Sequence, residues 1–138
     1  MPKTSASILL VEDDAFTVAL LRFVLERQGL QVHSVADGPA ALACMEQGPV
    51  PDAVLLDLLL PQLGGLAVLE RLRQHPGWAH TPVVVLSALD AGSDLAQAFA
   101  AGANDYVTKP FNPEELLARL QRLLPNTWPT LMAGASAA

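Results

Sequence analysis

The sequence has a single cysteine and no long apolar run, and each of these shortages excludes a class of protein. Cys44 stands alone, which excludes an internal disulfide and any metal site built from several cysteines. The apolar runs are far shorter than the roughly 20 residues of a membrane-spanning helix. No basic segment followed by an apolar one begins the chain, so no secretion signal is expected. These absences predict a cytoplasmic protein that does not contact the membrane.

Basic residues are also scarce, at 8 against 14 acidic residues, which gives a formal net charge of −6. They form no run, and because binding to a phosphate backbone requires clustered Lys or Arg, we expect no direct contact with nucleic acid. The only lysines are Lys3 and Lys109, since the other basic residues are arginines. Lysine at position 109 therefore favours a role for a compact ammonium group.

Apolar residues are abundant, at 51% of the 138 residues, and they occur in two alternating patterns. Short apolar runs predict five strands, and segments of period 3.6 predict five helices between them, which is typical of an α/β domain with a parallel sheet. The expected strands are 7–12, 30–35, 53–57, 81–87 and 104–107. The expected helices lie within 14–29, 37–46, 66–75, 90–101 and 112–124. The first helix is predicted to be amphipathic along Phe16, Leu20, Phe23 and Arg27.

Two of these helices have clear signals at their first residues. Asp14 is placed to cap the first helix. The last helix has Asn112 as its cap, Pro113 at the first helical position and Glu115 at the capping-box position. Residues 125–138 lose all periodicity, so we expect one domain over residues 1–124, followed by a tail or the start of a linker.

Asp57 ends the unbroken apolar run of the third expected strand, and it is the centre of the expected site. A lone Asp at a strand end most often marks a turn. Other strands, however, are also followed or ended by polar residues: Glu12 and Asp13, Ser87, and Lys109. In an open parallel sheet ligands bind outside the carboxyl ends of the strands, so we expect these side chains to share one space.

This combination of side chains is suited to phosphoryl transfer. Neighbouring carboxylates such as Asp13 and Asp57 repel each other, and a hard cation, Mg²⁺ or Mn²⁺, offsets this repulsion. Lys109 adds a second positive charge beside the ion. Asp57 can then attack phosphorus while Ser87 donates to a phosphoryl oxygen, which gives an aspartyl phosphate.

Four motifs, in this order and with this spacing, resemble the receiver domain of two-component response regulators over about residues 7–124. They are ILLVEDD, DAVLLDLLLPQLGG, VVVLSA and AGANDYVTKPF. The resemblance implies a flavodoxin-like, doubly wound (βα)5 fold with strand order 2-1-3-4-5. It also implies a signalling switch rather than an enzyme, which accepts a phosphoryl group from a sensor histidine kinase or phosphotransfer protein and acts on a downstream protein or effector domain.

The resemblance assigns a role to each polar residue of this site. Asp57 is the phosphoacceptor, and Lys109 is the phosphate-binding lysine. Asp13 binds Mg²⁺, Glu12 reaches the ion through water, and the main-chain carbonyl of Leu59 is a third protein ligand.

The resemblance also implies how the signal leaves the site. Ser87 and Tyr106 occupy the switch positions, so phosphorylation moves Ser87 toward the phosphoryl group and turns Tyr106 inward. The face formed by helix four, strand five and helix five reports the change. In relatives two side chains flank the water that removes the phosphoryl group, and here they are Leu59 and Leu89. Because neither can hydrogen-bond to water, we predict slow self-dephosphorylation.

The oligomeric state and the function class keep alternatives open. A phosphorylation-dependent homodimer is compatible with the sequence. The charge-paired dimer of winged-helix regulators is disfavoured, because such dimers use basic residues on helix four and residues 90–101 include none. Glu115 and Arg119 are present, but the expected partners for them in a second copy are not. A phosphatase of the haloacid dehalogenase type requires a second Asp where Leu59 stands. A flavodoxin-like nucleotide or flavin binder lacks its Gly-rich loop after strand one, and a pseudo-receiver would have lost an acidic residue or the lysine.

Overall fold

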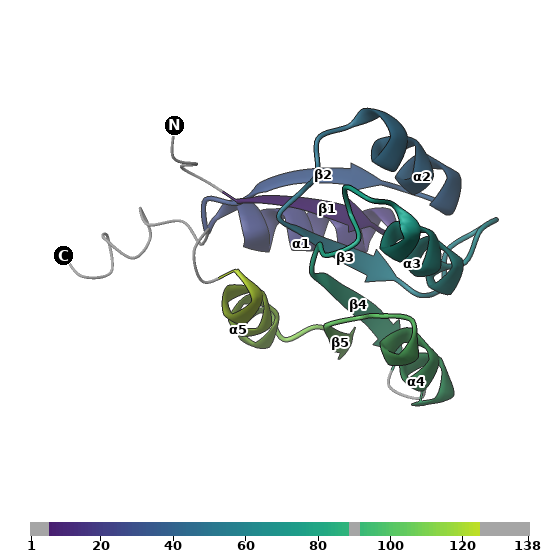
Figure 1. The fold of residues 1–138 in the computed structure, drawn as a ribbon. Helices are drawn as coiled ribbons and strands as arrows, with labels where there is room; N and C mark the ends of the chain where they lie inside the picture. The colour runs from purple at the N-terminus through teal and green to yellow at the C-terminus, as the bar shows by residue number, and fades with distance from the viewer. Residues whose placement is uncertain (1–5, 89–91, 125–138) are drawn as a thin grey trace.

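The computed structural model describes residues 6–88 and 92–124, in which five strands alternate with five helices (Figure 1). The strands are β1 (Ser7–Val11), β2 (Gln31–Val35), β3 (Ala53–Asp57), β4 (Val83–Ala88) and β5 (Asp105–Lys109). The helices are α1 (Ala15–Glu26), α2 (Gly38–Gln47), α3 (Gly65–Gln74), α4 (Gly92–Ala100) and α5 (Pro113–Leu123). Within these two ranges no helix is long and apolar enough to cross a membrane.

The strands form one parallel sheet in the order β2-β1-β3-β4-β5, which confirms the predicted order. Its central strand, β3, is buried along its whole length, because helices cover both faces of the sheet. The edge strand β2 is partly or fully exposed at every residue. All carboxyl ends therefore lie along one edge of the sheet, as the strand arrows indicate in Figure 1.

Two apolar cores lie on opposite faces of the sheet, because successive strand residues point to opposite sides. Ile8 and Leu10 of β1 pack with Leu21 and Leu25 of α1 and with the buried leucines of α5. Leu9 belongs to the other core, which also contains buried residues of α2, α3 and α4. The fold is thus a three-layer α/β/α sandwich.

Some predicted boundaries differ from the observed ones. Lys109 is the last residue of β5, not the residue after it, because the pairing with β4 continues through Thr108 and Lys109. The fourth strand begins at Val83 rather than at residue 81. Pro82, which precedes it, has no N–H to donate to a ladder.

The predicted cap of α1 is confirmed, but its apolar row faces solvent. Asp14 accepts a hydrogen bond from the Thr17 N–H at 2.9 Å. Leu21 and Leu25 are the buried residues of the helix. The predicted row is exposed, at 77% for Phe16, 38% for Leu20 and 59% for Phe23. This helix therefore presents a second apolar face that is largely exposed, although Arg27 lies over the Phe23 ring at 5.4 Å.

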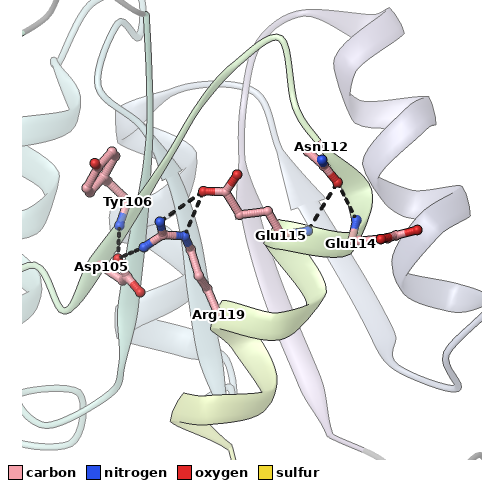
Figure 2. A network of polar contacts seen from close by, with 6 residues as sticks. All are labelled: Asp105, Tyr106, Asn112, Glu114, Glu115 and Arg119. Carbon is pink, nitrogen blue, oxygen red and sulfur yellow. Dashed lines mark hydrogen bonds and ion pairs between the residues drawn. The ribbon is translucent and has the colours of Figure 1, made fainter.

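The cap of α5 is also confirmed, whereas its capping box is not formed. The Asn112 side chain accepts from the N–H groups of Glu114 and Glu115 at 2.9 and 3.2 Å (Figure 2). The Glu115 carboxylate does not turn back to the cap, because it accepts two hydrogen bonds from Arg119 instead. A charged donor on the next turn is the stronger partner.

Candidate functional site

Three carboxylates meet at the carboxyl edge of the sheet, as the sequence predicts. Glu12 and Asp13 directly follow β1, and Asp57 is the last residue of β3, the strand that pairs with β1. One carboxylate oxygen from each residue lies within 4.8 Å of the other two. Glu12 and Asp57 are buried, at 1% and 3% exposure, whereas Asp13 is exposed. The cluster therefore opens to solvent on the side of Asp13.

Lys109 supplies a positive charge to this cluster from the end of β5. Its Nζ lies 2.9 Å from Glu12 Oε1 and 3.4 Å from Asp57 Oδ2. Because β4 separates β5 from β3, only a long side chain crosses this distance. The predicted convergence of Lys109 with Glu12 and Asp57 is confirmed.

The charges in the cluster perturb one another. Burial raises the pKa of Glu12, and the hydrogen bond from Lys109 offsets only part of that effect. Burial alone would lower the pKa of Lys109, but its contacts with Glu12 and Asp57 raise that pKa above the ordinary value. Lys109 therefore remains a cation at neutral pH. One ammonium does not balance three carboxylates, so the cluster favours a further cation.

The donor set fits a hard divalent cation. Carboxylate oxygens are the ligands that Mg²⁺ takes in proteins, and an exposed carboxylate leaves room for the waters that the ion retains. Among the described residues, no nitrogen or sulfur ligand accompanies the three carboxylates, which argues against zinc or copper.

The loop after β3 is built to pass close to Asp57. The Leu59 N–H donates to Asp57 Oδ1 at 3.1 Å, which orients the carboxylate. Gly65 N–H donates to the Leu58 carbonyl at 3.1 Å. A Cβ at position 65 would lie 2.2 Å from the Asp57 carbonyl oxygen, so only glycine fits there. Gly65 thus allows the loop to pass close to Asp57, although it has no side chain that could bind a ligand. The only sequence signal for it was the Gly64-Gly65 pair at the end of the motif DAVLLDLLLPQLGG, from which no role in the site was predicted.

Ser87 lies on β4 beside this cluster. Its neighbour Leu86 pairs with Asp57 in the sheet. The Ser87 side chain is 3% exposed, and its Oγ has no hydrogen-bond partner within the described residues. A buried hydroxyl without a partner is costly, so this position suits a polar group that arrives from outside the protein.

Tyr106 is half-buried and lies on the same face of the sheet as Ser87. Thr108 is the partner of Ser87 in the ladder, and Tyr106 lies two residues before Thr108 on the same strand, so its side chain points to the same face. The Tyr106 ring packs edge-on against Phe99 of α4, with ring centroids 6.0 Å apart. The structure therefore places it away from Asp57. Leu59 has an exposed side chain, at 70%, and Leu89 lies outside the described residues.

Comparison with known proteins places this geometry in a family. A family described as the response regulator receiver domain matches residues 8–121. The transcriptional regulatory proteins TcrA and KdpE of Mycobacterium tuberculosis are 45% and 46% identical to the chain over 92% and 83% of its length. These matches cover 51% of TcrA and 49% of KdpE, so the chain spans about half the length of these relatives.

A solved structure supports the same assignment. The receiver domain of the sensor histidine kinase PA1611 from Pseudomonas aeruginosa PAO1 has a magnesium ion coordinated in its active-site cleft. It is 34% identical with a TM-score of 0.81, and the match covers 88% of this chain and 99% of that one. By sequence and by fold, the chain belongs to the response regulator receiver domain family.

Proposed function

We propose that the chain is a phosphorylation-activated switch in which Asp57 accepts a phosphoryl group from a histidine. The donor is a sensor histidine kinase or a phosphotransfer protein. The observation that carries the proposal is the meeting of Asp57 with Glu12, Asp13 and Lys109 at one edge of the sheet. A carboxylate oxygen of Asp57 attacks phosphorus, the phosphorus–nitrogen bond breaks, and its electron pair stays on the donor imidazole.

Each neighbour of Asp57 has a part in this transfer. Lys109 leaves Glu12 and pairs with a phosphoryl oxygen, and Ser87 donates its unpaired hydroxyl to another. Asp13, Asp57 and the main-chain carbonyl of Leu59 would hold Mg²⁺ directly and Glu12 would reach it through water, and Mn²⁺ would be an acceptable substitute. When bound, the ion supplies positive charge that neutralises the phosphoryl oxygens in the transition state.

The signal then passes from Ser87 to Tyr106 and to the face of α4, β5 and α5. Ser87 moves toward the phosphoryl group, and Tyr106 turns into the space beside it. Residues 1–124 act as this switch for a downstream protein or effector domain, with 125–138 as a tail or linker. The chain itself makes no direct contact with nucleic acid, and a phosphorylation-dependent homodimer is one form that the output takes.

The phosphoryl group is expected to be long-lived. The Leu59 side chain is exposed beside Asp57 and offers no atom that can hydrogen-bond to an attacking water. Leu89, the second position of this kind, is also apolar. Neither side chain can orient the water that hydrolyses the aspartyl phosphate, so we expect hydrolysis to be slow.

Labelling with acetyl phosphate and Mg²⁺ tests this function. The wild type should gain one phosphoryl group, seen by intact mass, whereas Asp57→Asn and the wild type in EDTA should gain none. Asp37→Asn is the matched control, because Asn also caps a helix well and Asp37 caps α2 without belonging to the group of three carboxylates. Labelling of Asp57→Asn at the wild-type rate would refute the proposal. Continuous release of phosphate without a labelled protein would instead support a phosphatase.

A further inference from the structure

An arginine of α5 reaches around the edge strand β5 and joins two carboxylates (Figure 2). Arg119 donates from Nε and one terminal nitrogen to Glu115 Oε1, at 3.1 and 2.9 Å. Its other terminal nitrogen pairs with Asp105 Oδ1. The same Asp105 oxygen accepts the backbone N–H of Tyr106 at 2.8 Å. The guanidinium is thus held on two sides beside Tyr106.

The Tyr106 ring lies against this guanidinium. The Arg119 Cζ atom is 5.1 Å from the ring centroid, which is cation–π distance. The edge-on contact with Phe99 holds the ring from α4. Burial alone would lower the pKa of Arg119, but Glu115 and Asp105 raise it, so the group beside the ring is always a cation.

Arg119 connects the two faces of the sheet. Asp105 and Tyr106 are consecutive strand residues, so their side chains point to opposite faces. Asp105 pairs with Val84 of the α1 and α5 core, and Tyr106 pairs with Val85 of the other core. One guanidinium touches both because β5 is the edge of the sheet.

The observed position of Tyr106 excludes the position that the switch requires. Ser87 lies on the same face as Tyr106, because its ladder partner is Thr108, two residues after Tyr106. The buried Oγ of Ser87 has no hydrogen-bond partner among the described residues. A Tyr106 ring turned toward Ser87 would leave both Arg119 and Phe99. Contacts made only in the outward position stabilise that position alone.

We propose that Arg119 is a positioning residue that holds the Tyr106 ring away from the phosphoacceptor site, and so weakens the site's affinity for a phosphoryl group. The inference rests on the proposed function of Asp57. The proposal predicts a change in phosphoryl-group affinity that is opposite to the one expected from charge alone. Removing a positive charge from a protein ordinarily weakens anion binding, whereas release of Tyr106 strengthens it.

Titration with beryllofluoride and Mg²⁺, a mimic of the phosphoryl group, tests the inference. Tyr106 is the only tyrosine, so fluorotyrosine labelling gives one ¹⁹F resonance that reports its ring. In Arg119→Met the half-saturating concentration should fall about two- to five-fold, the range for a partly exposed cation–π contact. Without beryllofluoride, the resonance should already lie nearer its saturated position. Arg122→Met, an exposed arginine of the same helix, should match the wild type in both measurements.

The same comparison in a Tyr106→Leu protein distinguishes the effect of losing the ring contact from the effect of losing the charge of Arg119. In Tyr106→Leu, calorimetric titration should give the same beryllofluoride affinity with Arg119 and with Met at position 119, because the coupling is lost. An unchanged or weakened affinity in Arg119→Met, or a persistent effect in the Tyr106→Leu background, would overturn the inference. Should Arg119→Met fail to fold, Arg119→Gln gives the same comparison. Failure of the wild type itself to bind beryllofluoride would instead overturn the proposed function.

Discussion

Lys109 donates a hydrogen bond to Glu12 at 2.9 Å, across 97 residues of sequence. The same ammonium lies 3.4 Å from Asp57, so two buried carboxylates share one lysine. In the structure this cation stabilises the acidic cluster. In the proposed phosphorylated state the same cation is required by the phosphoryl group, so Lys109 has two competing roles.

The first prediction concerns removal of this cation and of the metal. Lys109→Met should lower the free energy of unfolding in EDTA by about 1.5–3 kcal/mol, the range for a charge-assisted hydrogen bond. Mg²⁺ should stabilise the variant more than it stabilises the wild type, because the variant's carboxylates have no other cation. Urea unfolding with and without Mg²⁺ measures both effects, with Arg122→Met as the control. Equal stabilisation of the two proteins by Mg²⁺ would contradict the prediction.

The convergence of this site could be predicted because the sheet is parallel. Once strands 7–12 and 53–57 are neighbours, Glu12, Asp13 and Asp57 must lie at one edge. The choice of partner within the site could not be predicted. Lys109 has several carboxylates within reach of its flexible stem, and packing decides which of them it contacts. Glu115 similarly had two available roles and pairs with Arg119 rather than with its own cap.

The exposed face of α1 shows a different limit of the sequence pattern. Hydrophobic periodicity indicates that a helix has an apolar row but not whether that row packs internally or remains exposed. Leu21 and Leu25 form the buried row, and Phe16, Leu20 and Phe23 form a second, exposed one. An exposed apolar row of this kind favours contact with a partner.

The second prediction assigns that row to the phosphodonor. Replacing Phe16 and Phe23 by Ala should slow phosphoryl transfer from a phosphorylated histidine kinase by about tenfold or more, because large buried aromatics dominate interfaces. Labelling by acetyl phosphate should not change, since a small donor needs no docking surface. Val50→Ala, which removes an exposed side chain before β3, is the control. Equal slowing with both donors would show that the row supports the fold instead.

The third prediction concerns the lifetime of the phosphoryl group. Leu59→Asn should accelerate its loss on the order of tenfold, because the amide can orient a water beside Asp57. Decay of the labelled protein after removal of acetyl phosphate measures the rate. Leu59→Met keeps an apolar side chain and should decay like the wild type. An unchanged rate in Leu59→Asn combined with Leu89→Glu would rule out this explanation.

The fourth prediction uses Cys44, which the structure places half-buried on α2. Burial raises the pKa of its thiol, so the folded protein has less thiolate at a given pH than the unfolded chain. Alkylation by iodoacetamide at pH 8 should therefore be slower in buffer than in urea. The difference should shrink as the pH rises past the folded pKa. Equal rates in buffer and in urea at pH 8 would contradict this account.

The fifth prediction concerns Arg73, which links three segments that lie apart in the sequence. It lies in the last turn of α3, where a basic residue would be expected only to complement the helix dipole. In the structure, Arg73 donates at 2.7–3.1 Å to the carbonyls of Gly102, Ala79 and Thr81 and to the Asn104 side chain. Asn104 in turn accepts the Val83 N–H at 2.8 Å. The guanidinium thus fixes the loop between α4 and β5 against the start of β4.

Loss of this guanidinium should leave several part-buried carbonyls without a partner. Arg73→Met is expected to lower the free energy of unfolding by about 2–4 kcal/mol, because each unpaired acceptor carries a desolvation cost. Arg73→Lys should fall between Met and the wild type, since an ammonium cannot reproduce the planar fork of donors. Arg71→Met, an exposed arginine of the same helix, should change stability by no more than about 0.5 kcal/mol. Equal losses at positions 71 and 73 in urea unfolding would show that charge at the end of α3, and not the hydrogen-bonded fork, stabilises this part of the fold.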